Sequence, residues 1–256
     1  LSPRRWPWLI TLAAALLSLF QLWQPLAGFL PPGALPFEWA LGMQPAAYFR
    51  PVHLCWILCL GLWIYPLQIR GVKYSWVDAL MCLLVLWASM RILQFDYSGI
   101  DHLLNGLSPP DFMAGLIIVG ATLELARRSI GPVMWGIGLV FIVYAAFGNV
   151  LPDVLATRGF SFERIIRFQV FTGAGLYGAP LGIAAGAVFS FVLFGAFLQV
   201  TGAGKMLIDL SFAAAGKSRG GPAKASVLAS AAMGSISGSA IANTVTTGSL
   251  TITMMK

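Results

Sequence analysis

Long apolar runs restrict the possible folds of this chain more than any other feature of its sequence. Hydrophobic residues make up 58% of the 256 residues and charged residues only 10%, against roughly a quarter charged in soluble domains. Roughly 20 predominantly apolar residues are enough to cross a bilayer as a helix. The sequence therefore predicts an all-α polytopic membrane protein with about six spanning helices, at Trp6–Leu26, Pro51–Leu67, Trp76–Ile92, Asp111–Ala126, Val133–Phe147 and Pro180–Val200.

Lysine and arginine predict the orientation of these spans, because cytoplasmic loops are enriched in them. A cytoplasmic N-terminus places the larger basic group inside and the smaller one outside. The basic residues occur singly or in pairs rather than as a stripe, so no nucleic-acid partner is expected despite a net charge of +7. The inner group is Arg4, Arg5, Arg70, Lys73, Arg127, Arg128, Lys205, Lys217, Arg219 and Lys224, and the outer group is Arg50, Arg91, Arg158, Arg164 and Arg167.

Metal and nucleotide sites find little support in the sequence. His53 lies close to Cys55 and Cys59, but no second ligand pair accompanies them, and we interpret all three as buried structural residues. Gly204 and Gly216 each precede a lysine, yet neither has the glycine that a phosphate-binding loop needs five positions earlier. We therefore expect no cofactor.

Carboxylates within the apolar segments do not form a catalytic arrangement. Asp78, Glu124 and Asp209 lie near span ends without a nearby base or metal ligand. Glu124 is expected to pair with Arg127 or Arg128, which follow it at helical spacing. We predict that the protein is not an enzyme.

A more polar segment follows the fifth span. From Phe160 to Ala179, charged and apolar residues alternate at helical spacing, which predicts a helix lying along the outer interface or packed on its neighbours. We interpret Arg164 and Arg167 as solvated or in contact with lipid headgroups rather than as ligand-binding residues.

The stretch GSISGSAIANTVTTG, from Gly234 to Gly248, is unusual in so apolar a chain. Its glycines and hydroxyl residues favour a broken helix over a continuous span. Irregular backbone at membrane depth is tolerated only inside protein or beside a watery cavity, where free carbonyl groups can bind a cation. Neutral side-chain oxygens would be added by Ser235, Ser237, Ser239, Asn243, Thr244, Thr246 and Thr247.

Tight helix packing is the alternative interpretation of this stretch. Gly234 and Gly238 form a G-x-x-x-G pair, a pattern that lets two membrane helices approach closely. On composition alone, packing and ion binding remain equally open. The corresponding alternative function is a non-transporting membrane scaffold or assembly subunit.

The C-terminal region resembles a known family. From Gly220 to Lys256 the chain is GGPAKASVLASAAMGSISGSAIANTVTTGSLTITMMK, which is similar to the signature region of the large membrane subunit of tripartite ATP-independent periplasmic (TRAP) transporters, in the form with fused small and large subunits. Three upstream stretches are similar to the same form: LELARRSIG from Leu123, VFIVYAAFGNVLPD from Val140, and FVLFGAFLQVTGAGKMLIDL from Phe191. The resemblance covers most of the chain from about Pro109.

This resemblance implies a sodium-driven secondary transporter of the bacterial cytoplasmic (inner) membrane. It implies an elevator-type mechanism, a periplasmic substrate-binding protein as partner, and import of a small organic anion such as a carboxylate. Residues 1–128 would correspond to the four-helix small subunit, and residues 129–256 would begin the large transport subunit.

The resemblance also implies a re-entrant helical hairpin at about residues 222–256, entering from the cytoplasm. One departure is Thr253, where the family usually has proline. The implied sodium ligands are Ser237 and Asn243. The implied hairpin tip, with sodium and substrate contacts, comprises Gly234, Ser235, Ser237, Gly238, Ser239, Asn243, Thr246, Thr247 and Gly248.

The family has a second, inverted half that completes the substrate site. We expect this chain to be an N-terminal piece of a longer product, whose remaining half and membrane lipids would be its further partners.

Overall fold

The computed structural model describes residues 7–31, 45–69, 72–97, 104–152, 154–236, 243–244 and 247–248. These residues are largely helical, with one short antiparallel strand pair, β1 (Gln68–Ile69) and β2 (Val72–Lys73). The chain divides into two compact units, residues 1–185 and 186–256. The division at residue 128, which rests on the resemblance to a small and a large subunit, stays a prediction.

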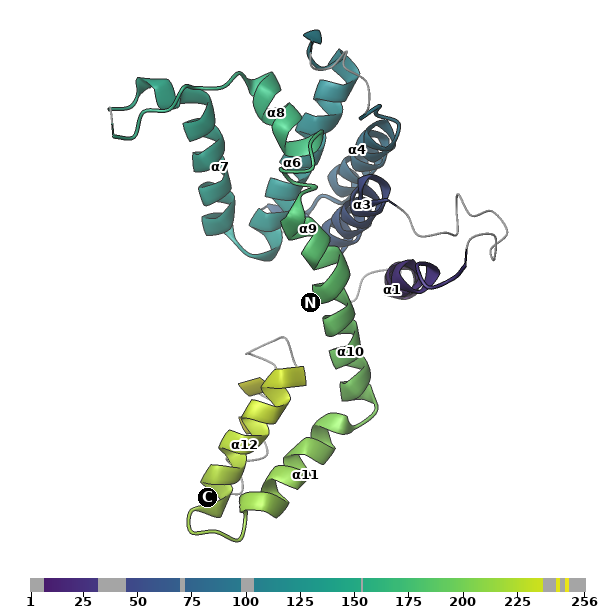
Figure 1. Cartoon of the computed structure of the whole chain (residues 1–256), viewed down its shortest axis with the longest axis vertical. Coiled ribbons are helices and arrows are strands. Elements are labelled where there is room, and N and C mark those ends of the chain that lie inside the picture. The colour runs from purple at the N-terminus through teal and green to yellow at the C-terminus, as the bar shows by residue number, and fades with distance from the viewer. Residues whose placement is uncertain are drawn as a thin grey trace. The chain divides into compact units, whose positions relative to one another are not determined.

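The described residues contain six helices long and apolar enough to cross a membrane, which confirms the predicted fold class. Figure 1 shows them among the other elements. They are α1 (Pro7–Ala27), α3 (Ala46–Ile64), α4 (Ser75–Leu93), α6 (Pro109–Ser129), α7 (Pro132–Phe147) with its 3-10 extension η1 (Gly148–Val150), and a helix built from α9 (Ala179–Ile183), the π-helical η2 (Ala184–Val188) and α10 (Phe189–Val200).

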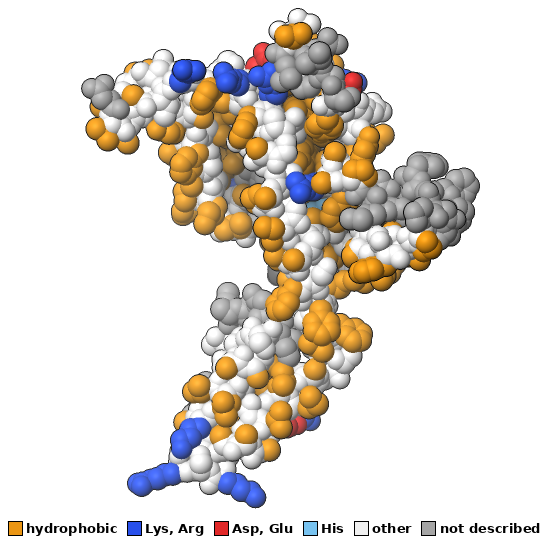
Figure 2. Space-filling model, viewed as in Figure 1, with side chains coloured by type: hydrophobic (Ala, Val, Ile, Leu, Met, Phe, Trp, Pro, Cys, Tyr) orange, Lys and Arg blue, Asp and Glu red, His pale blue; other side chains and the backbone are white. Residues whose placement is uncertain are grey.

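The outward surface of these helices is apolar, as a hydrocarbon surrounding requires. Figure 2 shows hydrophobic side chains spread over it. The helix α7 has no buried residue at all, and Leu19, Phe141 and Phe194 on three different helices are exposed. In water such a surface would drive aggregation, whereas in a bilayer it faces lipid tails.

The second span differs most from its predicted bounds of Pro51–Leu67, because α3 begins at Ala46 and ends at Ile64. Pro51 lies inside the helix, where it gives up one backbone hydrogen bond and is buried. The helix α3 ends before Leu67 because the Leu67 amide bonds a side chain instead of a helical carbonyl. It donates to both carboxylate oxygens of Asp78, at 3.3 and 3.2 Å.

The core of the first unit lies between α3, α4 and α6. Leu58, Val85 and Ile118, one from each helix, are almost completely buried there. The helix α8 (Phe162–Val170) closes this core with Ile166 and Val170, and its N-terminus is capped by Ser161, whose Oγ accepts from the Arg164 amide at 3.3 Å.

The helix predicted over residues 160–179 is therefore confirmed only in part. It ends at Val170, and a run of turns follows up to α9. Gly175 and Gly178 in this run lie so close to neighbouring backbone that a side chain would collide with it. The helix packs on α6, one of the two predicted arrangements.

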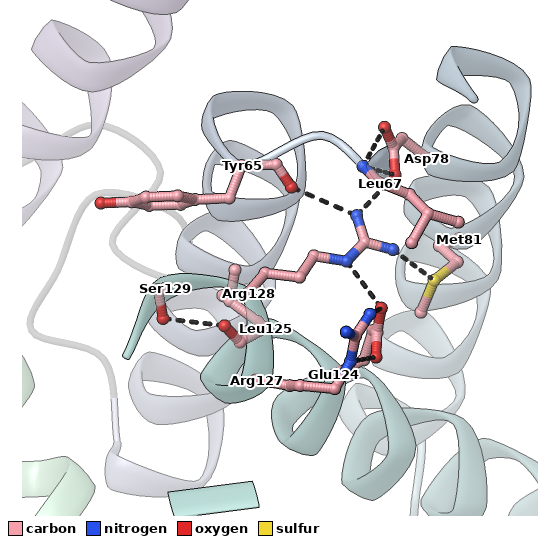
Figure 3. A network of polar contacts seen from close by, with 9 residues as sticks. All are labelled: Tyr65, Leu67, Asp78, Met81, Glu124, Leu125, Arg127, Arg128 and Ser129. Atoms are coloured by element: carbon pink, nitrogen blue, oxygen red, sulfur yellow. Dashed lines mark hydrogen bonds and ion pairs between the residues drawn. The ribbon is translucent and has the colours of Figure 1, made fainter. Parts of the chain in front are cut away.

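A buried network joins three helices at one end of the first unit (Figure 3). Arg128 Nη1 contacts Asp78 Oδ1 at 2.6 Å and the carbonyl oxygen of Tyr65 at 3.2 Å. Its Nε donates to Glu124 Oε1 at 2.7 Å, and its Nη2 to Met81 Sδ at 3.8 Å. The Arg128 side chain is 5% exposed. Arg128 thus ties the end of α6 to the end of α3 and the start of α4.

The predicted pairing of Glu124 with Arg127 or Arg128 is confirmed, and Glu124 pairs with both arginines. Arg127 donates to both Glu124 oxygens, at 2.8 and 2.7 Å, while Arg128 shares one of them. Unlike Arg128, Arg127 keeps 39% of its side chain exposed.

The opposite end of the same helices has its own polar ties. Arg91 Nη2 contacts Asp111 Oδ1 at 2.7 Å, which joins α4 to α6. The Leu107 amide donates to Glu163 Oε1 at 2.7 Å, which joins the segment before α6 to α8. The ion pairs that join α4 to α6 in the described residues thus lie at the two ends of these helices.

We predict that Arg128→Gln lowers the free energy of unfolding by about 3–5 kcal/mol, because it leaves the buried carboxylate of Asp78 without its cation. Arg127→Gln is the matched control, with an expected loss of about 1 kcal/mol or less, because its ion pair is partly exposed. Denaturation of the purified protein in detergent measures both. Equal losses would contradict the assigned role of Arg128.

Candidate functional site: a helical hairpin

The second unit contains two helices packed along each other, α11 (Ala203–Ala215) and α12 (Gly221–Ile236). Ile208 of α11 and Ala229 and Met233 of α12 form their buried contact. Gly204 lies against the end of the Met233 side chain, which an added side chain would approach to 3.2 Å. One side of α12 is therefore packed against α11.

The chain returns along α12 soon after that helix ends. The Nδ2 atom of Asn243 lies 3.0 Å from the carbonyl oxygen of Ser230 and 3.2 Å from Ser230 Oγ. Ser230 is six residues before the last residue of α12, so Asn243 lies about 9 Å back along the helix axis. The described residues on either side thus form the two arms of a hairpin.

The returning arm begins with helical contacts. Thr247 Oγ1 donates to the carbonyl oxygen of Asn243 at 2.7 Å, the contact that a hydroxyl makes with the carbonyl four residues earlier in a helix. Thr247 is 5% exposed.

These contacts do not involve Oδ1 of the Asn243 side chain. Its Oδ1 is buried and has no hydrogen-bond partner among the described residues. A buried acceptor without a partner costs about 1–3 kcal/mol, so such an atom is suited to a cation or another donor. The arrangement offers a neutral oxygen, and hard cations are bound through oxygen atoms.

The second unit presents almost no titratable acid. Asp209 is the only Asp or Glu in residues 186–256, which also contain no histidine; Asp209 lies on α11 and is exposed. Across the described residues, no group of three His, Cys, Asp or Glu side chains is placed to hold a metal ion. Any cation in the hairpin would therefore meet neutral oxygens.

The predicted site residues are only partly within the described chain. Asn243 and Thr247 lie together, and Gly234 lies against Asn243, since a side chain there would come within 3.3 Å of Nδ2. Ser235 points elsewhere, because its hydroxyl donates to the carbonyl oxygen of Ala232 at 2.7 Å. Gly248 is described as helical. The remaining predicted residues, Ser237, Gly238, Ser239 and Thr246, lie outside the described residues.

Sequence reasoning missed Ser230. It lies ahead of the glycine-rich stretch, in a run that reads as ordinary helix, and a helical pattern carries no signal of a partner thirteen residues away.

His53 and the cysteines take no part in this hairpin. His53 is buried in the first unit and its Nδ1 contacts Gln21 Nε2 of α1. The cysteines Cys55, Cys59 and Cys82 are free thiols.

We predict that Ser230→Cys with Asn243→Cys, in a chain whose native cysteines are replaced by alanine, forms a disulfide under mild oxidation. The matched control is Ser226→Cys with Asn243→Cys, which moves the first thiol one helical turn, about 6 Å, away. Mass spectrometry of the digested protein measures the cross-linked fraction. Cross-linking at least as fast in the control would contradict the hairpin geometry.

Comparison with known proteins gives this hairpin a family context. The family model described as tripartite ATP-independent periplasmic transporter, DctM component, matches residues 117–256. No curated protein and no solved structure matches the chain. The matched segment covers more than half of the chain and includes the whole hairpin, and this chain therefore belongs to the DctM family of TRAP transporter membrane components.

Proposed function

We propose that this TRAP transporter membrane component is a sodium-coupled permease. In this proposal it imports a small organic anion such as a carboxylate, which a periplasmic binding protein delivers. The observation that carries the proposal is the return of Asn243 beside Ser230, with a buried Oδ1 that has no hydrogen-bond partner among the described residues. The family match supports transport as the setting in which such an oxygen acts.

Sodium suits the hairpin better than a proton as the coupling ion. A proton-coupled site needs a group that titrates, and residues 222–248 contain no Asp, Glu, His or Cys. Amide, hydroxyl and main-chain carbonyl oxygens bind a hard cation without titrating. The ligands we propose are Asn243 Oδ1, Ser237 and main-chain carbonyl groups near the tip.

The membrane potential can supply the energy. Each elementary charge that crosses about 100 mV is worth roughly 2.3 kcal/mol, so two sodium ions would contribute about 4–5 kcal/mol before any concentration gradient. In this proposal the hairpin moves as part of an elevator-type transport domain.

The proposed location is the bacterial inner membrane with a cytoplasmic N-terminus. The turn between α11 and α12 carries the exposed residues Lys217 and Arg219, and Lys224 is exposed in the first turn of α12. Figure 2 shows basic side chains gathered at this end of the unit. Enrichment of basic residues in cytoplasmic loops supports entry of the hairpin from that side.

A non-transporting scaffold is the competing function. The close contact of Gly204 with Met233 shows that small residues in this unit do serve packing. A scaffold does not explain why Asn243 is oriented with Oδ1 away from Ser230. It predicts that the polar side chains can be replaced with little effect beyond assembly.

We predict that Ser237→Ala, Ser239→Ala and Asn243→Ala each raise the sodium concentration for half-maximal uptake, by about tenfold or more where a direct ligand is lost. Uptake by the complete transporter in proteoliposomes, with its binding protein, measures this. Ser218→Ala, whose hydroxyl donates to the Ala215 carbonyl at 2.8 Å, serves as the control. An unchanged sodium requirement in all three variants would remove the proposed site.

Orientation is tested separately by thiol labelling. In spheroplasts of a cysteine-free variant, we expect a membrane-impermeant maleimide to label Arg158→Cys directly and Lys217→Cys only after the membrane is opened, because the two exposed positions are assigned to opposite sides. Direct labelling of Lys217→Cys alone would invert the topology.

A further inference from the structure

Two hydrogen bonds and one glycine fix the orientation of the Asn243 side chain, and all three features belong to α12. A main-chain carbonyl oxygen can only accept hydrogen bonds, so the Asn243 atom 3.0 Å from the Ser230 carbonyl oxygen must be the amide nitrogen. The same nitrogen also donates to Ser230 Oγ, at 3.2 Å. Gly234 leaves the space that this nitrogen occupies.

This arrangement decides which atom of Asn243 remains available. With Nδ2 bonded on the α12 side, Oδ1 is directed away from Ser230, and it is the atom that is buried without a described partner. An amide turned by half a revolution would present its NH₂ group, whose hydrogen atoms repel a cation. The Ser230 contacts therefore determine whether the side chain offers an acceptor or a donor.

The geometry points to Ser230 as a positioning residue of the sodium site. It acts through Asn243: by accepting hydrogen bonds at two atoms it holds the amide with Oδ1 towards the coupling ion and keeps the returning arm at a fixed height along α12. This inference rests on the proposed sodium coupling and extends it to a residue outside the glycine-rich stretch.

The role of Ser230 differs from that of its neighbours on the same helix. Ser226 Oγ donates to the carbonyl oxygen of Ala223 at 2.8 Å, and Ser235 Oγ to that of Ala232 at 2.7 Å. These hydroxyls bond their own helix, whereas Ser230 Oγ accepts from the other arm. Ser226 is therefore a matched control for loss of a serine hydroxyl from α12.

The test measures sodium-dependent uptake by the complete transporter in proteoliposomes, with its binding protein. We expect Ser230→Ala to raise the sodium concentration for half-maximal uptake about 2- to 10-fold, the effect of one hydrogen bond, with the maximal rate at saturating sodium unchanged. Ser230→Thr keeps the hydroxyl and should restore the wild-type value. Ser226→Ala should leave the sodium requirement unchanged.

A double-mutant cycle separates positioning from a general loss of structure. If Ser230 acts through Asn243, then Ser230→Ala has no further effect on the sodium requirement of Asn243→Ala. Additive effects would overturn the inference. If Ser230→Ala does not assemble, Ser230→Cys, which keeps the volume with a weak acceptor, replaces it with the same expectations.

These measurements also distinguish failure of the role of Ser230 from failure of sodium coupling. A sodium requirement that changes in Asn243→Ala but not in Ser230→Ala overturns the role of Ser230 and leaves sodium coupling standing. Uptake by the unmodified transporter that does not depend on sodium overturns both.

Discussion

The bilayer demands that every backbone polar group find its partner inside the protein, and the structure follows from that demand. The six long apolar helices satisfy it by pairing their backbone groups internally. The hairpin is where the chain departs from one continuous helix, since α12 ends at Ile236 and the chain is back beside Ser230 at Asn243. Polar groups at such a reversal need partners, and a bound cation is one kind of partner.

Charge is handled differently in the two units. In the first, Arg127 and Arg128 form ion pairs with Asp78 and Glu124 at the helix ends, and these pairs link α4 to α6. In the hairpin, Asn243 offers an uncharged oxygen. In the proposed function, a sodium ion bound there would add its own positive charge to the hairpin, and the membrane potential would act on that charge.

The sequence predicted well what depends on local pattern. The six spans, the pairing of Glu124 with arginine and a helix within residues 160–179 all follow from apolar runs or helical spacing. It did not predict contacts between distant segments. Arg128 reaches Asp78 fifty residues away, and Asn243 reaches Ser230 across a reversal of the chain. Such partners are chosen by tertiary packing, which a single sequence does not display. The end of α3 was misplaced for the same reason, because Asp78 captures the Leu67 amide.

The central claim is that the reversal after α12 holds a sodium ion with neutral oxygens. Its most direct test is a pair of experimental density maps of the complete transporter, one prepared in sodium and one in an organic cation too large for the site. The account predicts compact density beside Asn243 Oδ1 in the sodium map only, with the helix interrupted around Ser237. A continuous helix through that position, or identical maps in the two cations, would contradict it.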